Sequence, residues 1–191
     1  MYTIYIYNNG SNRLERYRLE PYQNMPYTSH DSMFVSEFFS NTRSEIGWSS
    51  SDFLIAWSNF SKGRVRIKSA FRRISEGGHI AQSMHYAGLA ADTDSGDISP
   101  FPYVESGHVG LYPAGYPVLS YGDIGPFVLV MQDALISLGF SEVKLDGFFG
   151  HETAKGLLRF LDCYNISPQK LCDHSVWQAL TLHATGCGGL L

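Results

Sequence analysis

A histidine and an aspartate seven residues apart stand in a run of small residues that could hold a metal ion. Residues 82–92 read Gln-Ser-Met-His-Tyr-Ala-Gly-Leu-Ala-Ala-Asp, which places His85 and Asp92 on either side of Gly88. Gly88 permits a reversal of the backbone and Ala90 leaves space, so an imidazole and a carboxylate can converge on one cation. Taken singly, His85 is read equally well as a core histidine bonded to a backbone carbonyl.

A second group with the required chemistry lies further along the chain. The segment Tyr-Val-Glu-Ser-Gly-His ends at His108, with Glu105 three residues before it. A catalytic zinc needs three protein ligands, an open position for water and a nearby carboxylate that takes the proton of that water. His85, Asp92 and His108 meet the ligand requirement and Glu105 meets the base requirement, although Glu105 alone could cap a turn.

These residues resemble the M15 group of zinc peptidases, which includes D-Ala-D-Ala carboxypeptidases that cut the stem peptides of peptidoglycan. The family's Ser-x-His-x-x-Gly-x-Ala-x-Asp segment is matched from Ser83 to Asp92, and its later His preceded by a Glu is matched by His108 and Glu105. The resemblance implies Zn2+ as cofactor, bound by His85, Asp92 and His108, with Glu105 activating the water.

The resemblance extends to residues around these ligands. Ser69-Ala-Phe-Arg72 resembles the family's Ser-x-x-Arg segment, which implies that Arg72 stabilises the oxyanion of the tetrahedral intermediate. Without the resemblance, Arg72 is read as a surface ion-pair residue. Gln82, Ser83 and Tyr86 flank the first ligand, and the resemblance implies that they contact the substrate.

The C-terminal third of the chain has the pattern of a small helical module. Apolar residues recur at mostly helical spacing through residues 128–138 and end at Gly139, which predicts a helix closed by a left-handed cap. Two further helices are expected, one that turns Leu157, Leu158 and Phe160 inward and one over residues 172–182.

This pattern resembles the peptidoglycan-binding type 1 domain, and the resemblance implies peptidoglycan as a partner. The chemistry of Gln132, Asp146, Gly147, Gly150 and Thr153 does not require this, because all five could be turn and cap residues that touch no ligand. The matching residues are Gly122, Val128, Gln132, Leu135, Gly139, Asp146, Gly147, Phe149, Gly150, Thr153, Phe160, Trp177 and Leu180.

Alternating strands and short helices are expected to position the candidate ligands. Asn8-Asn9-Gly10 predicts a hairpin turn that accommodates positive φ. The expected elements are strands at 2–7, 11–19 and 65–71 and helices at 32–39 and 51–60. Together with these elements, the two resemblances imply an α+β protein, whose parts are a small antiparallel-sheet zinc-peptidase-like domain at 1–117, a three-helix peptidoglycan-binding module at 118–183 and a tail at 184–191.

Composition and charge exclude several classes of partner. With 14 basic and 18 acidic residues interspersed, the chain lacks the basic stripe that nucleic-acid binding needs. No Sec signal and no apolar run long enough to cross a bilayer is present, so we expect no membrane partner and a monomer. Cys163, Cys172 and Cys187 are expected to be free thiols, with a disulfide between the first two as the alternative.

Two hypotheses follow for function. The first is a zinc-dependent peptidase that hydrolyses stem-peptide amide bonds and is anchored to the wall by its C-terminal module. The second is a non-catalytic peptidoglycan-binding protein, spore- or phage-associated, because only 12 residues separate Asp92 from Glu105 and the peptidase domain could be trimmed. Either protein would act at the cell wall or spore after release by a non-classical route.

Overall fold

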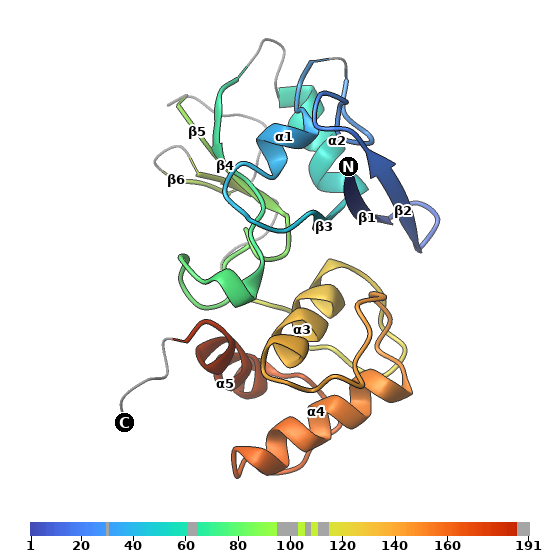
Figure 1. The fold of residues 1–191 in the computed structure, drawn as a ribbon, viewed down its shortest axis with the longest axis vertical. Helices are drawn as coiled ribbons and strands as arrows, with labels where there is room; N and C mark the ends of the chain where they lie inside the picture. Colours follow the sequence, from blue (N-terminus) through green and yellow to red (C-terminus); the bar gives the residue numbers. More distant parts are fainter. Residues whose placement is uncertain (30, 61–64, 95–102, 106–107, 111–114, 187–191) are drawn as a thin grey trace. The chain divides into compact units, whose positions relative to one another are not determined.

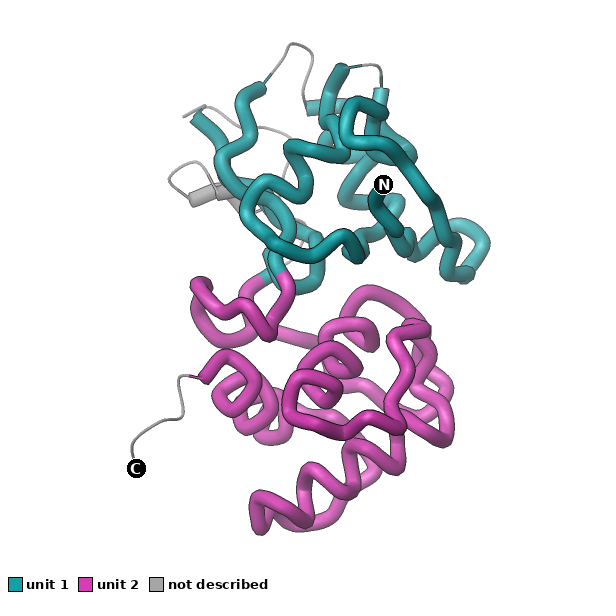
Figure 2. Tube along the Cα trace, in the orientation of Figure 1, with its two compact units in different colours: residues 1–72, 84–114 teal, residues 73–83, 115–191 magenta. Residues whose placement is uncertain are grey.

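The computed structural model describes residues 1–29, 31–60, 65–94, 103–105, 108–110 and 115–186 (Figure 1). The chain forms two compact units, coloured separately in Figure 2. Unit 1 consists of Met1–Arg72 and Met84–Ala114, and unit 2 of Arg73–Ser83 and Gly115–Leu191. Residues 73–83 thus pack in unit 2 although the residues before and after them belong to unit 1, and we call this segment the excursion. The sequence predicted only one boundary between domains, between residues 117 and 118.

A three-stranded sheet opens unit 1 in the order β2-β1-β3. The predicted hairpin is confirmed: β1 (Tyr2–Asn8) pairs antiparallel with β2 (Arg13–Leu19). The residue with positive φ in its turn is Asn12 (φ 53) rather than Gly10. A strand that the sequence did not predict, β3 (Ile46–Ser50), pairs parallel with β1 on its other side.

Two helices follow the strands of this sheet. The helix expected over residues 32–39 is reduced to one turn, α1 (Val35–Phe38), whereas α2 (Ser51–Phe60) has the predicted bounds. The hydroxyl oxygen of Ser50 accepts the N–H of Phe53 at 3.3 Å, so the last residue of β3 also caps the helix. Aromatic rings that pack within 6 Å of one another fill the space beside the sheet: Tyr2, Phe38, Phe39, Trp48 and Phe71.

A second sheet completes unit 1 in the order β4-β5-β7-β6. Its strands are β4 (Ile67–Ser69), β5 (Ala90–Thr93), β6 (Tyr103–Glu105) and β7 (His108–Gly110), and every neighbouring pair is antiparallel. The strand expected over residues 65–71 is thus shortened to three residues. Helices together with two small sheets confirm the α+β class.

In its described residues, unit 2 contains three α-helices and one short 3-10 helix. These are η1 (Ile74–Glu76), α3 (Pro126–Ser137), α4 (His151–Cys163) and α5 (His174–Ala184). Gly139 follows α3 with φ 94, as the cap prediction required, and the Asp173 carboxylate accepts the N–H of Val176 at 3.0 Å to cap α5. The three predicted helices are confirmed. Leu157 and Phe160 are buried as predicted, but Leu158 is exposed and the prediction that it points inward is wrong.

Two of the three cysteines lie in the described part of the chain and both are free. Cys163 is exposed, whereas Cys172 is buried, and burial raises the pKa of its thiol well above the usual range. Cys163 and Cys172 therefore do not form the disulfide that was the alternative prediction. Cys187 lies outside the described residues. Across those residues, no helix combines the length and the apolar composition needed to span a membrane.

Candidate functional site

The second sheet of unit 1 aligns three of the predicted site residues. Asp92 on β5 is the register partner of His108 on β7, and His108 is in turn the partner of Glu105 on β6. On its other side Asp92 pairs with Ser69 on β4. The α-carbons of four residues from four strands therefore form one line across the sheet, which we call the row.

His85 adjoins the row and turns one ring nitrogen toward it. The imidazole is buried, with Nδ1 2.5 Å from the carbonyl oxygen of Ala70 and Nε2 3.3 Å from Oδ1 of Asp92. Because a carbonyl oxygen only accepts, Nδ1 carries a proton and donates it to Ala70. Nε2 is then the ring nitrogen that can bind a cation, and it faces the Asp92 carboxylate.

The separation of these two side chains is that of two zinc ligands as well as that of a hydrogen-bonded pair, and among the described residues no three His, Cys, Asp or Glu side chains are grouped so that they could hold a metal ion. With Zn–N and Zn–O bonds of about 2.0–2.1 Å, two ligand atoms of a tetrahedral centre lie about 3.3 Å apart. Nε2 of His85 and Oδ1 of Asp92 are 3.3 Å apart. A backbone carbonyl that holds the other ring nitrogen, as Ala70 does, is the usual way to orient a zinc-binding histidine. The Asp92 side chain is 34% exposed, which leaves a solvent-facing side.

Ser69 adds a polar atom to the row. Its side chain is buried, and within the part of the chain that the structure describes, Oγ has no hydrogen-bond partner. A buried hydroxyl without a partner costs about 1–3 kcal/mol. Because Ser69 is the register partner of Asp92, this hydroxyl lies beside the candidate ligands. A polar ligand bound there would offset the free-energy cost by forming a hydrogen bond with Oγ.

The turn that carries His85 is built against β3. Within residues 84–89 the N–H of Gly88 donates to the carbonyl of His85 at 3.1 Å. The Trp48 indole N–H donates to the carbonyl of Tyr86 at 2.9 Å, and the Ser49 hydroxyl donates to the carbonyl of Gly88 at 2.6 Å. β3, which the sequence did not predict, is therefore the strand that holds the turn of His85 in place.

Replacing Gly88 by alanine is expected to destabilise unit 1 by about 3 kcal/mol. Gly88 has φ 65, and a Cβ there would lie 1.9 Å from the carbonyl oxygen of Trp48. Urea unfolding followed by near-ultraviolet circular dichroism measures the loss. Gly139→Ala is the matched control, because φ is 94 and a Cβ would meet no atom within 4 Å. Equal losses in the two variants would contradict the close approach of Trp48.

Arg72 lies next to the backbone of His85. Its N–H donates to the His85 carbonyl at 3.3 Å, and its Nε donates to the carbonyl of Asn41 at 2.8 Å. Nε thus tethers the guanidinium to the Asn41 backbone, and the side chain is half-buried. Its action on an oxyanion stays a prediction.

The three residues expected to contact substrate are buried, and two of them belong to the excursion. The side-chain oxygen of Gln82 accepts the N–H of Tyr116 at 3.1 Å, and the carbonyl of Ser83 accepts the Tyr116 hydroxyl at 2.7 Å. Tyr86 is fully buried in unit 1. Substrate contact by these three side chains stays a prediction.

In unit 2 the residues of the peptidoglycan-binding pattern bond to one another. The buried amide of Gln132 donates to Oδ1 of Asp146 at 2.7 Å, to the carbonyl of Phe148 at 3.0 Å and to Oγ1 of Thr153 at 3.0 Å. Its oxygen accepts the N–H groups of Asp146 and Gly147 at 3.1 and 2.8 Å. Because Gln132 is fully engaged, it fixes the turn that leads into α4, as the interpretation of turn and cap residues predicted.

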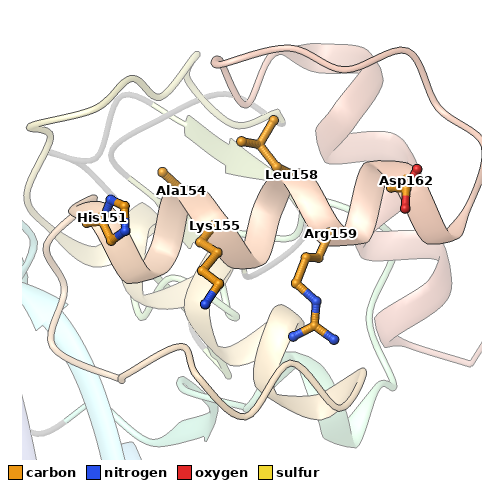
Figure 3. A pocket seen from close by; sticks show the side chains of 6 residues that line it. All are labelled: His151, Ala154, Lys155, Leu158, Arg159 and Asp162. Atoms are coloured by element: carbon orange, nitrogen blue, oxygen red, sulfur yellow. The ribbon is translucent and has the colours of Figure 1, made fainter.

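A shallow groove of about 430 Å³ follows one face of α4 (Figure 3). Ala154 and Leu158 lie along one edge, and Lys155 and Arg159 along the other. The six lining residues are His151, Ala154, Lys155, Leu158, Arg159 and Asp162. The sequence did not predict this groove, because the spacing of apolar residues in α4 indicates only which residues are buried.

Comparisons with known proteins return two similar solved structures. No protein-family model and no curated protein matches the chain. The SleB N-terminal domain is 27% identical with a TM-score of 0.35, over 37% of this chain and 96% of that chain. A peptidoglycan-binding protein from Clostridioides difficile, in complex with glutamine hydroxamate, is 19% identical with a TM-score of 0.36, over 52% of this chain and 54% of that chain. Both TM-scores lie below 0.5, so the function proposed below rests on the residues of this chain.

Proposed function

We propose that the chain is a zinc-dependent cell-wall peptidase that hydrolyses amide bonds in peptidoglycan stem peptides. The observation that carries the proposal is the row: Asp92, His108 and Glu105 are consecutive register partners, and Nε2 of His85 lies 3.3 Å from Asp92. The zinc-peptidase resemblance implies these four residues, and the backbone register of Asp92, His108 and Glu105 supports the proposal. The protein would act as a monomer at the cell wall or spore.

Each residue has a defined task in this proposal. His85, Asp92 and His108 would hold Zn2+, which when bound polarises the peptide carbonyl and acidifies a water molecule. Glu105 accepts the proton of that water as it attacks the amide carbon, and then delivers the proton to the departing amine nitrogen. Arg72 donates to the carbonyl oxygen as negative charge develops on it.

Unit 2 is proposed to bind peptidoglycan. Support comes from the sequence resemblance of residues 122–180 and from the bonded turn around Gln132, which gives that pattern a rigid frame. Attachment to the polymer would raise the local concentration of stem peptides around the first unit. A hydrolytic unit and a wall-binding unit in one chain thus serve the same substrate.

A second candidate is a peptidoglycan-binding protein without catalytic activity. The burial of Gln82, Ser83 and Tyr86 favours it, since these are the side chains that the resemblance assigns to the substrate. In this alternative the row is a remnant or a structural site, while unit 2 keeps its partner.

One experiment separates the two candidates. The full chain is incubated with purified peptidoglycan and zinc, the wall is sedimented, and the supernatant is analysed by mass spectrometry for released amino acids and peptides. The peptidase predicts protein in the pellet together with products that disappear when zinc is chelated. Protein in the pellet without released products would support the non-catalytic peptidoglycan-binding protein. Protein that stays in the supernatant without released products would contradict both candidate functions.

A further inference from the structure

The excursion joins two residues of the candidate site, yet it packs in the other unit. The chain leaves unit 1 after Arg72 and returns at Met84, one residue before His85. At the base of the excursion the N–H of Arg72 donates to the His85 carbonyl at 3.3 Å. Whatever fixes the two ends of residues 73–83 therefore acts on the backbone that presents His85.

The first end is fixed by an ion pair between Arg73 and a buried carboxylate. Arg73 donates from Nε to Oδ1 of Asp133 at 2.8 Å and contacts the same oxygen through Nη2, while the N–H of Ile74 donates to Oδ2 at 3.2 Å. The Asp133 side chain lies on α3 and is 1% exposed. Burial raises its pKa, against the opposing effects of Arg73 and the Ile74 N–H. Both carboxylate oxygens of Asp133 are thus used to hold the start of the excursion.

The second end is fixed by Tyr116. Its hydroxyl donates to the carbonyl of Ser83 at 2.7 Å, and its N–H donates to the side-chain oxygen of Gln82 at 3.1 Å. Gln82 has φ 59, a backbone conformation that non-glycine residues seldom adopt. The Tyr116 ring packs edge-on against the buried ring of Trp177, with 4.8 Å between the ring centroids. The end that leads into His85 is thereby held in one conformation.

We infer that Arg73, Asp133 and Tyr116 are positioning residues for His85. They belong to unit 2, whereas the proposed ligands belong to unit 1, and they hold both ends of the segment from which the ligand-bearing turn begins. The inference rests on the proposed function only in treating His85 as a metal ligand. In physical terms, loosening either end increases local opening of residues 84–89, because these residues follow the excursion directly.

Hydrogen–deuterium exchange of the full chain tests the inference without any ligand. The amides of Ala87, Gly88 and Leu89 report on the turn, since they donate to the carbonyls of Met84 and His85. Asp133→Asn is expected to speed their exchange by about tenfold and to weaken zinc binding, measured by competition with a chelating dye, by a similar factor. Arg73→Lys keeps the positive charge but loses the contact of two nitrogens with Asp133. It replaces Asp133→Asn in the experiment if that variant folds poorly.

Gln132→Met is the matched control. Gln132 neighbours Asp133 on α3 and is equally buried, but it bonds to the turn at residues 146–153 and not to the excursion. Exchange at residues 87–89 should then stay within about twofold of the wild type. Unchanged exchange in both Asp133→Asn and Arg73→Lys, or an equal rise in Gln132→Met, overturns the inference. Faster exchange in Asp133→Asn in a chain that binds no zinc supports it and contradicts the proposed function instead.

Discussion

Glu105→Gln is expected to lower stem-peptide cleavage by about 10²–10⁴-fold while leaving the zinc content unchanged. An amide side chain has nearly the size of a carboxylate but cannot take the proton of the attacking water. The backbone of Glu105 pairs with that of His108 in the row, so the substitution leaves all three proposed ligands in place. The comparison requires kcat/KM of the variant and the wild type on the same purified stem peptide.

Glu152→Gln serves as the control for this experiment, because Glu152 is an exposed carboxylate in the first turn of α4. It should cleave at the wild-type rate. If Glu105→Gln also cleaves at that rate, Glu105 is not the base, and the role implied by the zinc-peptidase resemblance has to be given up. A parallel loss of zinc would instead indicate that Glu105 is needed to build the metal site.

Arg73→Ala is expected to reduce the stability of unit 2 by about 3–5 kcal/mol. The Asp133 carboxylate is buried, and removal of its guanidinium partner leaves a charge without compensation in a medium of low polarity. Urea unfolding followed by the fluorescence of Trp177, a buried residue of the same unit, measures the loss.

The matched control for Arg73 is the ion pair of Arg159 with Glu142. The Arg159 side chain is 55% exposed, so Arg159→Ala should cost no more than about 1 kcal/mol. Similar losses in the two arginine variants would mean that burial does not set the strength of the Arg73 pair. The combined Arg73→Ala and Asp133→Ala variant should recover part of the stability, because it removes the stranded charge.

The types of the site residues could be read from the sequence, but their arrangement could not. Motif spacing selected His85, Asp92, Glu105 and His108 because metal ligands and bases belong to few residue types. Their alignment depends on the pairing of β5 with β7 and of β6 with β7. Strand register is set by the hydrophobic pattern of the paired strands, and strands of three or four residues are too short for that pattern to predict it.

The support of the site was hidden from the sequence for two reasons. β3 reads Ile-Gly-Trp-Ser-Ser, which has no alternation of apolar and polar residues, since four of its five residues are buried. The excursion is held by the ion pair of Arg73 with Asp133, which are 60 residues apart in the sequence. No local sequence pattern predicts a contact between residues so far apart. In unit 2, by contrast, helix periodicity and turn residues are local signals, and they predicted all three helices.

Local interpretation also favoured function over structure at residues beside the ligands. Substrate contact by Gln82 was implied by the zinc-peptidase resemblance and stays a prediction. In the structure its amide oxygen accepts the N–H of Tyr116, a residue 34 positions away. Buried polar side chains usually satisfy backbone groups, and this need competes with any role in binding.

Zinc content of the purified full chain tests the central claim most directly. We expect about one zinc per chain after incubation with zinc and removal of excess metal, and a loss of that zinc in His85→Ala, whose ring supplies Nε2 to the site. Trp48, which holds the turn, reports by near-ultraviolet circular dichroism whether the variant keeps its fold. A wild-type chain that binds no zinc, or a folded His85→Ala variant that keeps it, would contradict the proposed metal site.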